Sequence, residues 1–346
     1  MFIGFNLFKY LNLFDRFRDK DHIIIITNEK LYSLHYQEVK KNILKTTSKI
    51  DEVIIPDGEQ NKSLKTAVRV FEFLKKNKYS KSIVLVALGG GVIGDLTGFI
   101  SSIYLRGTHF VQIPTSLLSQ IDSSMGGKNA INYEDAKNMI GSFYHPDLVI
   151  INLDFLETLP IRHFRSGMAE AIKYGIAMNY DFFCWIEDNY EKISLLDEES
   201  IRHLVLLCCK MKCEVVVQDP KEYRNKRVLL NLGHTFAHSI ESFSKFNESL
   251  YHGEAVSIGM VISLKIANIV NRFSERDIFR VISLLKRFDL PLSYQRHIPF
   301  EDYLYFMNYD KKRTGQDQIN LVLPLKIGTS ILYRNIDKKI IYHAIY

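Results

Sequence analysis

Three histidines and one glutamate have the clearest potential for metal chemistry in this sequence. His234 and His238 lie four residues apart in a segment that predicts a helix, so both imidazoles share one helical face. His252 opens another helical segment, and Glu170 lies in a mostly apolar one, where a carboxylate needs a partner. Two imidazoles and one carboxylate suit a catalytic zinc ion with one open position, although nickel and cobalt accept the same ligands. The spacing leaves open whether one or both of His234 and His238 bind metal, and any single histidine is more often a core residue.

A glycine-rich turn follows the most apolar predicted strand, residues 82–88, and precedes a predicted helix over residues 96–105. Gly89, Gly91 and Gly94 fit the dinucleotide-binding pattern, in which missing Cβ atoms let the backbone approach a pyrophosphate. No acidic residue follows about 20 positions later to bind a ribose, so we expect ribose contacts from elsewhere. The segment Asp57–Lys62 offers carboxylates and a lysine, but its composition is more typical of an exposed turn followed by a helix N-terminus.

A third set of side chains consists of basic and amide groups that are spread over separate predicted elements. They are Lys128, Lys137, Asn138, Lys212, Arg227, Asn231, Lys311 and Lys312. Cations from different elements can converge on a phosphorylated, anionic substrate. Taken singly, each is more typical of a solvated surface charge.

The elements that must position these residues change in kind near residue 153. Apolar runs predict strands of a mainly parallel α/β sheet at 22–27, 52–55, 82–88, 110–113 and 148–152, with a helix at 64–76. Helical spacing then dominates at 164–178, 181–189, 198–217, 234–244, 253–271 and 276–288, with late strands at 318–323 and 329–333. We therefore predict a dinucleotide-binding α/β domain over residues 1–153 and a mainly α-helical metal- and substrate-binding domain over residues 154–346.

Composition agrees with a globular protein of two domains. The 346 residues are 47% hydrophobic, which excludes a disordered or fibrous chain, and the charge of 45 − 39 = +6 includes no dense basic block that would favour nucleic acid. We expect no signal peptide, since Lys9 interrupts the apolar start, and we expect residues 255–264 to form a buried helix that is too short to span a bilayer. Cys184, Cys208, Cys209 and Cys213 lack a second pair at zinc-ligand spacing, so we expect buried thiols in a reducing cytoplasm.

Four longer motifs resemble the 3-dehydroquinate synthase family. They begin at GGGVIGDLTGF, SGMAEAIKYG, LNLGHTFAHSIE and YHGEAV, and the similarity runs from about residue 57 to residue 327. The resemblance implies a cytoplasmic, homodimeric lyase with NAD and one divalent metal ion, zinc or cobalt, and an active site in the cleft between its two domains. Its substrate would be 3-deoxy-D-arabino-heptulosonate 7-phosphate (DAHP). Transient oxidation by NAD, phosphate elimination, re-reduction and an intramolecular aldol closure would give 3-dehydroquinate, a step of the shikimate pathway.

The resemblance also implies roles for individual residues. It makes Glu170, His234 and His252 the metal ligands, with His238 facing the substrate. The matched NAD-contacting residues are Asp57, Gly58, Glu59, Gln60, Asn61, Lys62, Gly91, Val92, Ile93, Gly94, Asp95, Thr115, Ser116, Lys128, Lys137, Phe155, Leu156, Glu157 and Thr158. The matched substrate residues are Asp122, Lys128, Lys137, Asn138, Lys212, Arg227, Asn231, His238 and one or both of Lys311 and Lys312, with Arg106 from the neighbouring subunit.

The sequence departs from the family pattern at a few places, and alternatives remain. His163 stands where the family usually has Glu, Ser116 replaces a frequent Thr, and the stretch before Asp57 matches poorly. The alternatives are another sugar phosphate cyclase, making 2-deoxy-scyllo-inosose or a valiolone, a metal-dependent alcohol dehydrogenase, and a non-enzymatic binding protein. Among the cyclases, the sequence favours the enzyme that uses DAHP, because the carboxylate of this substrate needs cationic partners such as those among Lys128, Lys137, Asn138 and Arg227.

Overall fold

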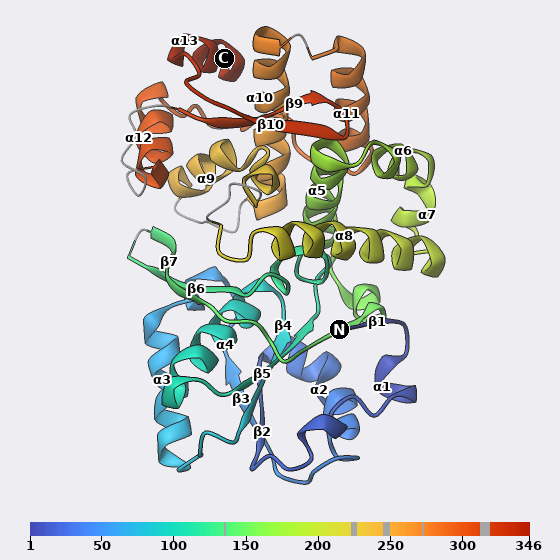
Figure 1. Cartoon of the computed structure of the whole chain (residues 1–346), viewed down its shortest axis with the longest axis vertical. Helices are drawn as coiled ribbons and strands as arrows, with labels where there is room; N and C mark the ends of the chain where they lie inside the picture. The colour runs from blue at the N-terminus through green and yellow to red at the C-terminus, as the bar shows by residue number, and fades with distance from the viewer. Residues whose placement is uncertain (135, 223–226, 245–249, 272, 312–318) are drawn as a thin grey trace. The chain divides into compact units, whose positions relative to one another are not determined.

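A computed structural model describes residues 1–134, 136–222, 227–244, 250–271, 273–311 and 319–346, without the side chains of 308–311. The chain forms two compact units, one made of Met1–Pro160 with Ile201–Cys209 and the other of Ile161–Ser200 with Lys210–Tyr346. Figure 1 shows a sheet with helices in the first unit and a mainly helical second unit. The sequence predicted this fold class correctly. The assignment of separate functions to residues 1–153 and 154–346 stays a prediction.

The first unit is built on a six-stranded sheet whose neighbouring strands all run parallel. The strands, in spatial order, are β1 (Phe2–Gly4), β8 (Leu148–Asn152), β5 (His109–Pro114), β4 (Val84–Gly89), β2 (Ile23–Asn28) and β3 (Ile50–Ile55). Five of them were predicted from their apolar runs, and the three-residue β1 was not. Since β3 lies on one side of β2 and β4 on the other, the order of the chain reverses between β2 and β4.

Helices cover both faces of this sheet, which explains why the central strands are apolar throughout. Ile23 and Ile25 of β2 face a core that includes α2 (Glu29–Ile43). Ile24 and Ile26 face the opposite core, which includes α3 (Leu64–Lys76) and α4 (Gly91–Ile103). Alternate residues of a strand point to opposite faces, so both faces need apolar side chains.

An antiparallel hairpin packs against α4 and was not predicted. It pairs β6 (Lys128–Tyr133) with β7 (Ala136–Phe143), and the Ser142 hydroxyl donates to that of Ser102 in α4 over 2.8 Å. The hairpin therefore carries three predicted substrate residues, which are Lys128, Lys137 and Asn138.

The second unit is mainly helical, as predicted, with one antiparallel strand pair. Its helices are α5 (Ile161–Met178), α6 (Tyr180–Asp188), α7 (Tyr190–Ser194), α9 (His234–Phe243), α10 (His252–Asn271), α11 (Glu275–Arg287), α12 (Phe300–Lys311) and α13 (Lys338–Ile345). The strand pair is β9 (Leu321–Lys326) with β10 (Thr329–Tyr333), and α8 (Glu198–Gln218) contributes residues to both units. Helix α10 packs against α5, α9, α11, α13 and β9 and so forms the core of this unit.

Helix α10 is long and apolar enough to cross a membrane by length and composition, but 72% of its apolar window is buried inside the protein. All residues from Ala255 to Leu264 are buried, so the predicted buried helix is confirmed. The four cysteines are free thiols; Cys208 and Cys209 are buried, while Cys184 and Cys213 are partly exposed.

Candidate functional site

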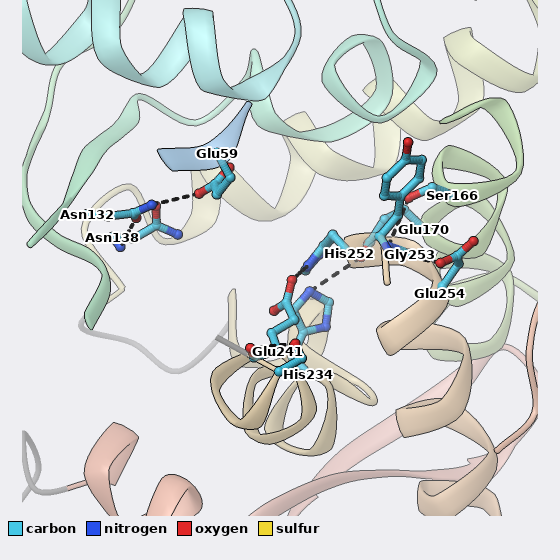
Figure 2. Close-up of polar contacts among 12 residues, drawn as sticks. Glu59, Asn132, Asn138, Ser166, Glu170, His234, Glu241, His252, Gly253 and Glu254 are labelled. Carbon is cyan, nitrogen blue, oxygen red and sulfur yellow. Dashed lines mark hydrogen bonds and ion pairs between the residues drawn. The ribbon is translucent and has the colours of Figure 1, made fainter. Parts of the chain in front are cut away.

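The predicted metal residues come together from three helices of the second unit. Glu170 lies in α5, and His234 and His252 are the first residues of α9 and α10. One ligand atom from each side chain lies within 4.8 Å of the others. The Nε2 atoms of His234 and His252 are each 3.4 Å from the same oxygen, Glu170 Oε1. Figure 2 shows the three side chains converging.

A hydrogen bond at Nδ1 fixes how each imidazole faces this point. The Nδ1 of His234 lies 3.2 Å from the carbonyl oxygen of Leu232, which can only accept, so Nδ1 carries the proton. The Nδ1 of His252 lies 3.1 Å from Glu241 Oε1, a carboxylate oxygen that accepts in the same way. Both rings therefore turn Nε2 toward Glu170.

Electrostatics keep these groups in the protonation states that a metal requires. Burial raises the pKa of Glu170, but the Lys173 ammonium that is paired with it, together with His234 and His252, outweighs burial and holds that pKa well below its usual range. Burial and the charge of Lys173 lower the pKa of His234 to about 3. At neutral pH the site therefore offers an anionic carboxylate and a neutral imidazole, the forms that bind metal.

The residues present fit a divalent cation. Tetrahedral coordination with bonds of about 2.0–2.2 Å separates neighbouring ligand atoms by about 3.3–3.6 Å. Both distances from an imidazole nitrogen to the carboxylate oxygen are 3.4 Å, within that interval. The neutral His234 Nε2 also presents a lone pair to a carboxylate oxygen, an unfavourable contact that a cation between them would relieve. Three donors leave a fourth position open for substrate.

Other predicted substrate residues of the second unit lie on neighbouring elements. The ring centroid of His238 is 5.5 Å from that of His234 and 6.5 Å from that of His252, but among the described residues His238 is not part of the three-residue ligand group. Lys212 and Arg227 are buried, and Asn231 is exposed. Helix α12 ends at Lys311, whose side chain is outside the described part of the chain, as is all of Lys312.

In the first unit, the segments matched to NAD contacts all follow the carboxyl ends of parallel strands. These segments are Asp57–Lys62 after β3, Gly91–Asp95 after β4, Thr115–Ser116 after β5 and Phe155–Thr158 after β8. In open parallel sheets, ligands bind outside the carboxyl ends of the strands, close to the point where strand order reverses. The sheet therefore gathers four separate stretches of sequence at one edge.

The glycine-rich turn has the close packing that its residues predict. Gly90 precedes the first residue of α4 and, as a glycine, has no side chain with which to cap that end of the helix. A Cβ on Gly94 would lie 2.9 Å from Gln112 Oε1, so the helix start packs closely against β5. The free N–H groups at the first turn of α4 can receive a phosphate.

The Asp57–Lys62 segment is more than a solvated turn, because it ends in a buried lysine. Lys62 is 4% exposed, and its ammonium bonds to the side chains of Asp95 and Asn138. Burial raises the pKa of Asp95, and Lys62 opposes that rise. Glu59 accepts a hydrogen bond of 2.9 Å from the Asn132 amide, whose oxygen accepts from the backbone of Asn138 (Figure 2). This network joins three predicted cofactor residues to the predicted substrate residue Asn138.

Replacing Lys62 with methionine should lower the free energy of unfolding by about 2 kcal/mol, because the largely buried Asp95 carboxylate would lose its cation. Chemical denaturation of the NAD-free protein measures the change. Adding Asp95→Asn removes the unpaired charge and should restore part of the loss. A double variant no more stable than Lys62→Met would contradict the ion-pair explanation.

The remaining predicted residues of the first unit differ widely in exposure. Thr115 is buried, Ser116, Asp122 and Lys137 are partly exposed, and Arg106 and Lys128 are exposed.

His163, the departure from the family pattern, lies in the second unit, where its ring stacks on Tyr251 with centroids 4.5 Å apart. Arg162 packs over the same tyrosine and binds Glu254 at 2.6 and 2.7 Å, so this position supports the start of α10 beside His252.

Four residues near these sites were missed by the sequence analysis. Asn28 ends β2, and its amide donates to Asp57 over 2.9 Å. Lys173 pairs with Glu170 three residues earlier, and Glu241 accepts from His252. Asn132 binds Glu59 from the unpredicted hairpin. Two of them had a visible signal, since Lys173 follows Glu170 by one helical turn and Glu241 follows His234 by two.

The fold is shared with solved structures of known enzymes. The structure is similar to 2-epi-5-epi-valiolone synthase from Streptomyces hygroscopicus subsp. jinggangensis 5008, solved with NAD⁺ and Zn²⁺ bound, with a TM-score of 0.91, 24% identity and coverage of 99% of this chain and 94% of that one. It is also similar to 2-deoxy-scyllo-inosose synthase, solved with carbaglucose-6-phosphate, NAD⁺ and Co²⁺, with a TM-score of 0.89, 22% identity and coverage of 99% and 95%. The chain thus has the fold of the sugar phosphate cyclases.

Sequence comparison gives the particular family. Residues 52–166 match the family model of the 3-dehydroquinate synthase N-terminal domain, and residues 167–313 match that of the C-terminal domain. The chain is 41% identical to 3-dehydroquinate synthase of Buchnera aphidicola subsp. Baizongia pistaciae (strain Bp) over 345 residues, covering 100% of this chain and 96% of that protein. The chain belongs to the 3-dehydroquinate synthase family, as its motifs predicted.

Proposed function

We propose that this chain converts DAHP to 3-dehydroquinate and phosphate, with NAD and one zinc or cobalt ion as cofactors. The observation that carries the proposal is the convergence of Glu170, His234 and His252 on one point in a chain with this family membership. The strand-edge segments that match the NAD contacts support the cofactor assignment. The product places the enzyme in the shikimate pathway, which leads to the aromatic amino acids.

In the proposed reaction the cofactors supply the hydride transfer and the polarisation, and the residues of the chain bind the cofactors. When bound, NAD would take up one hydride and return it, which leaves no net oxidation, and the divalent ion would polarise the reacting hydroxyl. Glu170, His234 and His252 would hold the ion, and the segments beginning at Asp57, Gly91, Thr115 and Phe155 would hold NAD. On this assignment residues 1–153 serve the cofactor, and residues 154–346 serve the metal and the substrate.

Substrate recognition falls to the basic and amide residues. Arg227 and Lys212 are buried cations, which suits them to orient the carboxylate or phosphate of DAHP, because a desolvated cation binds an anion more strongly. The Nη1 atom of Arg227 donates a hydrogen bond of 3.0 Å to the carbonyl oxygen of Pro220, so the guanidinium is held in position. His238 contacts the phosphate or moves a proton. Asp122, Lys128, Lys137, Asn138, Asn231 and one or both of Lys311 and Lys312 complete the proposed substrate set.

We assign the enzyme to the cytoplasm and to a homodimer. Four free thiols agree with a reducing compartment. The surface beside Arg106 has the character of an interface, since exposed apolar side chains lie near the end of α4 and on the hairpin packed against it. They are Ile103, Leu105, Met139, Ile140 and Phe143. Leu105 and Arg106 both have positive φ, 48° and 65°, and such a strained turn suits an arginine that reaches into a neighbouring subunit.

A complementation experiment tests the role of Arg106. The Arg106→Ala and His252→Ala homodimers should each be nearly inactive. Mixed dimers would contain one complete site, with His252 from one chain and Arg106 from the other. Random mixing makes half the dimers mixed, so activity should recover to about a quarter of the wild-type value. No recovery in a preparation that contains mixed dimers would show that Arg106 acts within its own subunit.

The function itself is tested by comparing substrates. The purified chain, loaded with Zn²⁺ or Co²⁺ and supplied with NAD, is incubated separately with DAHP, glucose 6-phosphate and glycerol. We expect phosphate release from DAHP alone. Release from glucose 6-phosphate would favour another sugar phosphate cyclase, and NADH formation from glycerol would favour an alcohol dehydrogenase. Absence of any phosphate release from DAHP by metal-loaded protein would refute the assignment.

A further inference from the structure

Glu241 is a buried acidic residue that the proposed reaction does not use. It lies in α9 seven residues after His234, so both side chains project from the same face of this helix. Its side chain is 6% exposed, which is unusual for a carboxylate unless a specific partner stabilises it. Its Oε1 atom accepts a hydrogen bond of 3.1 Å from the Nδ1 atom of His252. Figure 2 shows this contact between α9 and the first residue of α10.

The two imidazoles of the ligand group are held by different acceptors. A backbone carbonyl, that of Leu232, holds His234, whereas a carboxylate holds His252. A carboxylate at Nδ1 fixes the tautomer that leaves the Nε2 lone pair available and makes that nitrogen a stronger donor to a metal ion. It also restricts rotation of the ring. His252 therefore depends on a side chain that mutation can remove, and His234 does not.

We propose that Glu241 is a positioning residue that orients and polarises His252 for metal binding. The proposal rests on the proposed metal site and adds a residue that acts on it through His252. Helix α9 then contributes to the metal site twice. It provides the ligand His234, and its Glu241 orients the ligand His252 of α10, which packs against α9. Replacement of Glu241 should weaken metal binding although the three ligand residues themselves are unchanged.

The test measures the affinity for Zn²⁺ of the full-length chain by competition with a chelator. Glu241→Ala should weaken binding about 10- to 100-fold. Glu241→Gln should lose less, because an amide oxygen can still accept from Nδ1–H. Ser239→Ala is the matched control, since Ser239 is buried in the same helix and donates to the carbonyl of Thr235 over 2.9 Å. This control should keep the wild-type affinity.

A second readout separates positioning from general damage to the fold. In metal-free protein with ¹⁵N-labelled histidine, His252 of the wild type should show a protonated Nδ1 and an unprotonated Nε2. In Glu241→Ala this preference should disappear while the signals of His343, an exposed residue of α13, stay unchanged. The Co²⁺ absorption spectrum of the Glu241→Ala variant should also differ from that of the wild type.

The outcomes distinguish this inference from the proposed function. If the wild type binds Zn²⁺ and Glu241→Ala binds it equally well with the same His252 tautomer, the role of Glu241 is refuted and the metal site stands. If the wild type binds no Zn²⁺ or Co²⁺, the metal site and the role of Glu241 fall together. Weaker binding with a changed His252 tautomer, and an unaffected Ser239→Ala, supports the inference.

Discussion

Replacement of His252 with alanine is expected to lower the affinity for Zn²⁺ or Co²⁺ by more than about 100-fold, more than the loss of a residue that only orients a ligand. His252 provides one of the two nitrogen atoms that lie 3.4 Å from Glu170 Oε1, and the remaining pair, Glu170 and His234, cannot complete a three-ligand site. Metal-dependent activity should disappear with the metal. Metal content by atomic absorption and titration with Co²⁺ measure the loss.

Two other histidines serve as controls for this variant. His238→Ala should keep the metal and lose activity, because its ring lies beside the ligand group without belonging to it. His343→Ala, on the exposed side of α13, should keep both metal and activity. Circular dichroism should show that all three variants fold. Undiminished turnover of His252→Ala, or loss of metal from His238→Ala, would contradict the ligand assignment.

Replacement of Gly253 with alanine is expected to damage the metal site through the backbone alone. A Cβ on Gly253 would lie 1.9 Å from the carbonyl oxygen of Ser166, and this atom belongs to the backbone of α5, which cannot rotate away. The first turn of α10 and helix α5 would have to separate by about 1 Å, and they carry His252 and Glu170. We expect a loss of about 3 kcal/mol in unfolding free energy.

Metal affinity should fall at least about 10-fold in Gly253→Ala, because the separation acts directly on the distance between His252 and Glu170. Gly90→Ala is the matched control. A Cβ at Gly90 would have its nearest neighbour, Ser116 Oγ, at 3.4 Å, and the φ of −75° suits alanine. Thermal unfolding and Zn²⁺ titration should separate the two variants. Equal stability and affinity would show that α5 and α10 tolerate the extra carbon.

The sequence predicted the elements whose burial follows a simple pattern, either apolar residues throughout a strand or apolar residues at helical spacing. The strands β2, β4 and β8 are apolar on both faces, and α3 was predicted with its observed bounds, Leu64–Lys76. Helix α2 was missed because its buried side includes polar side chains. Asn42, for example, is buried and donates to the carbonyls of Phe8 and Leu11, a role that no local pattern reveals. The hairpin β6–β7 was missed because its residues are mostly small, polar or exposed.

In the candidate metal site, too, local sequence patterns predicted some features, while others depend on contacts between distant segments. The helical spacing of His234 and His238 indicated a shared face but could not choose between them, since the choice depends on where Glu170 and His252 lie in space. The burial of Lys62 and the contact of Glu241 with His252 depend on pairings between distant segments. Family resemblance indicated the ligand set, and the structure shows the distances, tautomers and charges that explain it.

The yield of phosphate per NAD tests the proposed function most directly. Metal-loaded protein is given a large excess of DAHP over NAD, and phosphate, 3-dehydroquinate and NADH are followed together. We expect equal amounts of phosphate and 3-dehydroquinate, many molecules of each per NAD, and no accumulation of NADH. Accumulation of NADH in proportion to product, or no phosphate from metal-loaded protein, would contradict it.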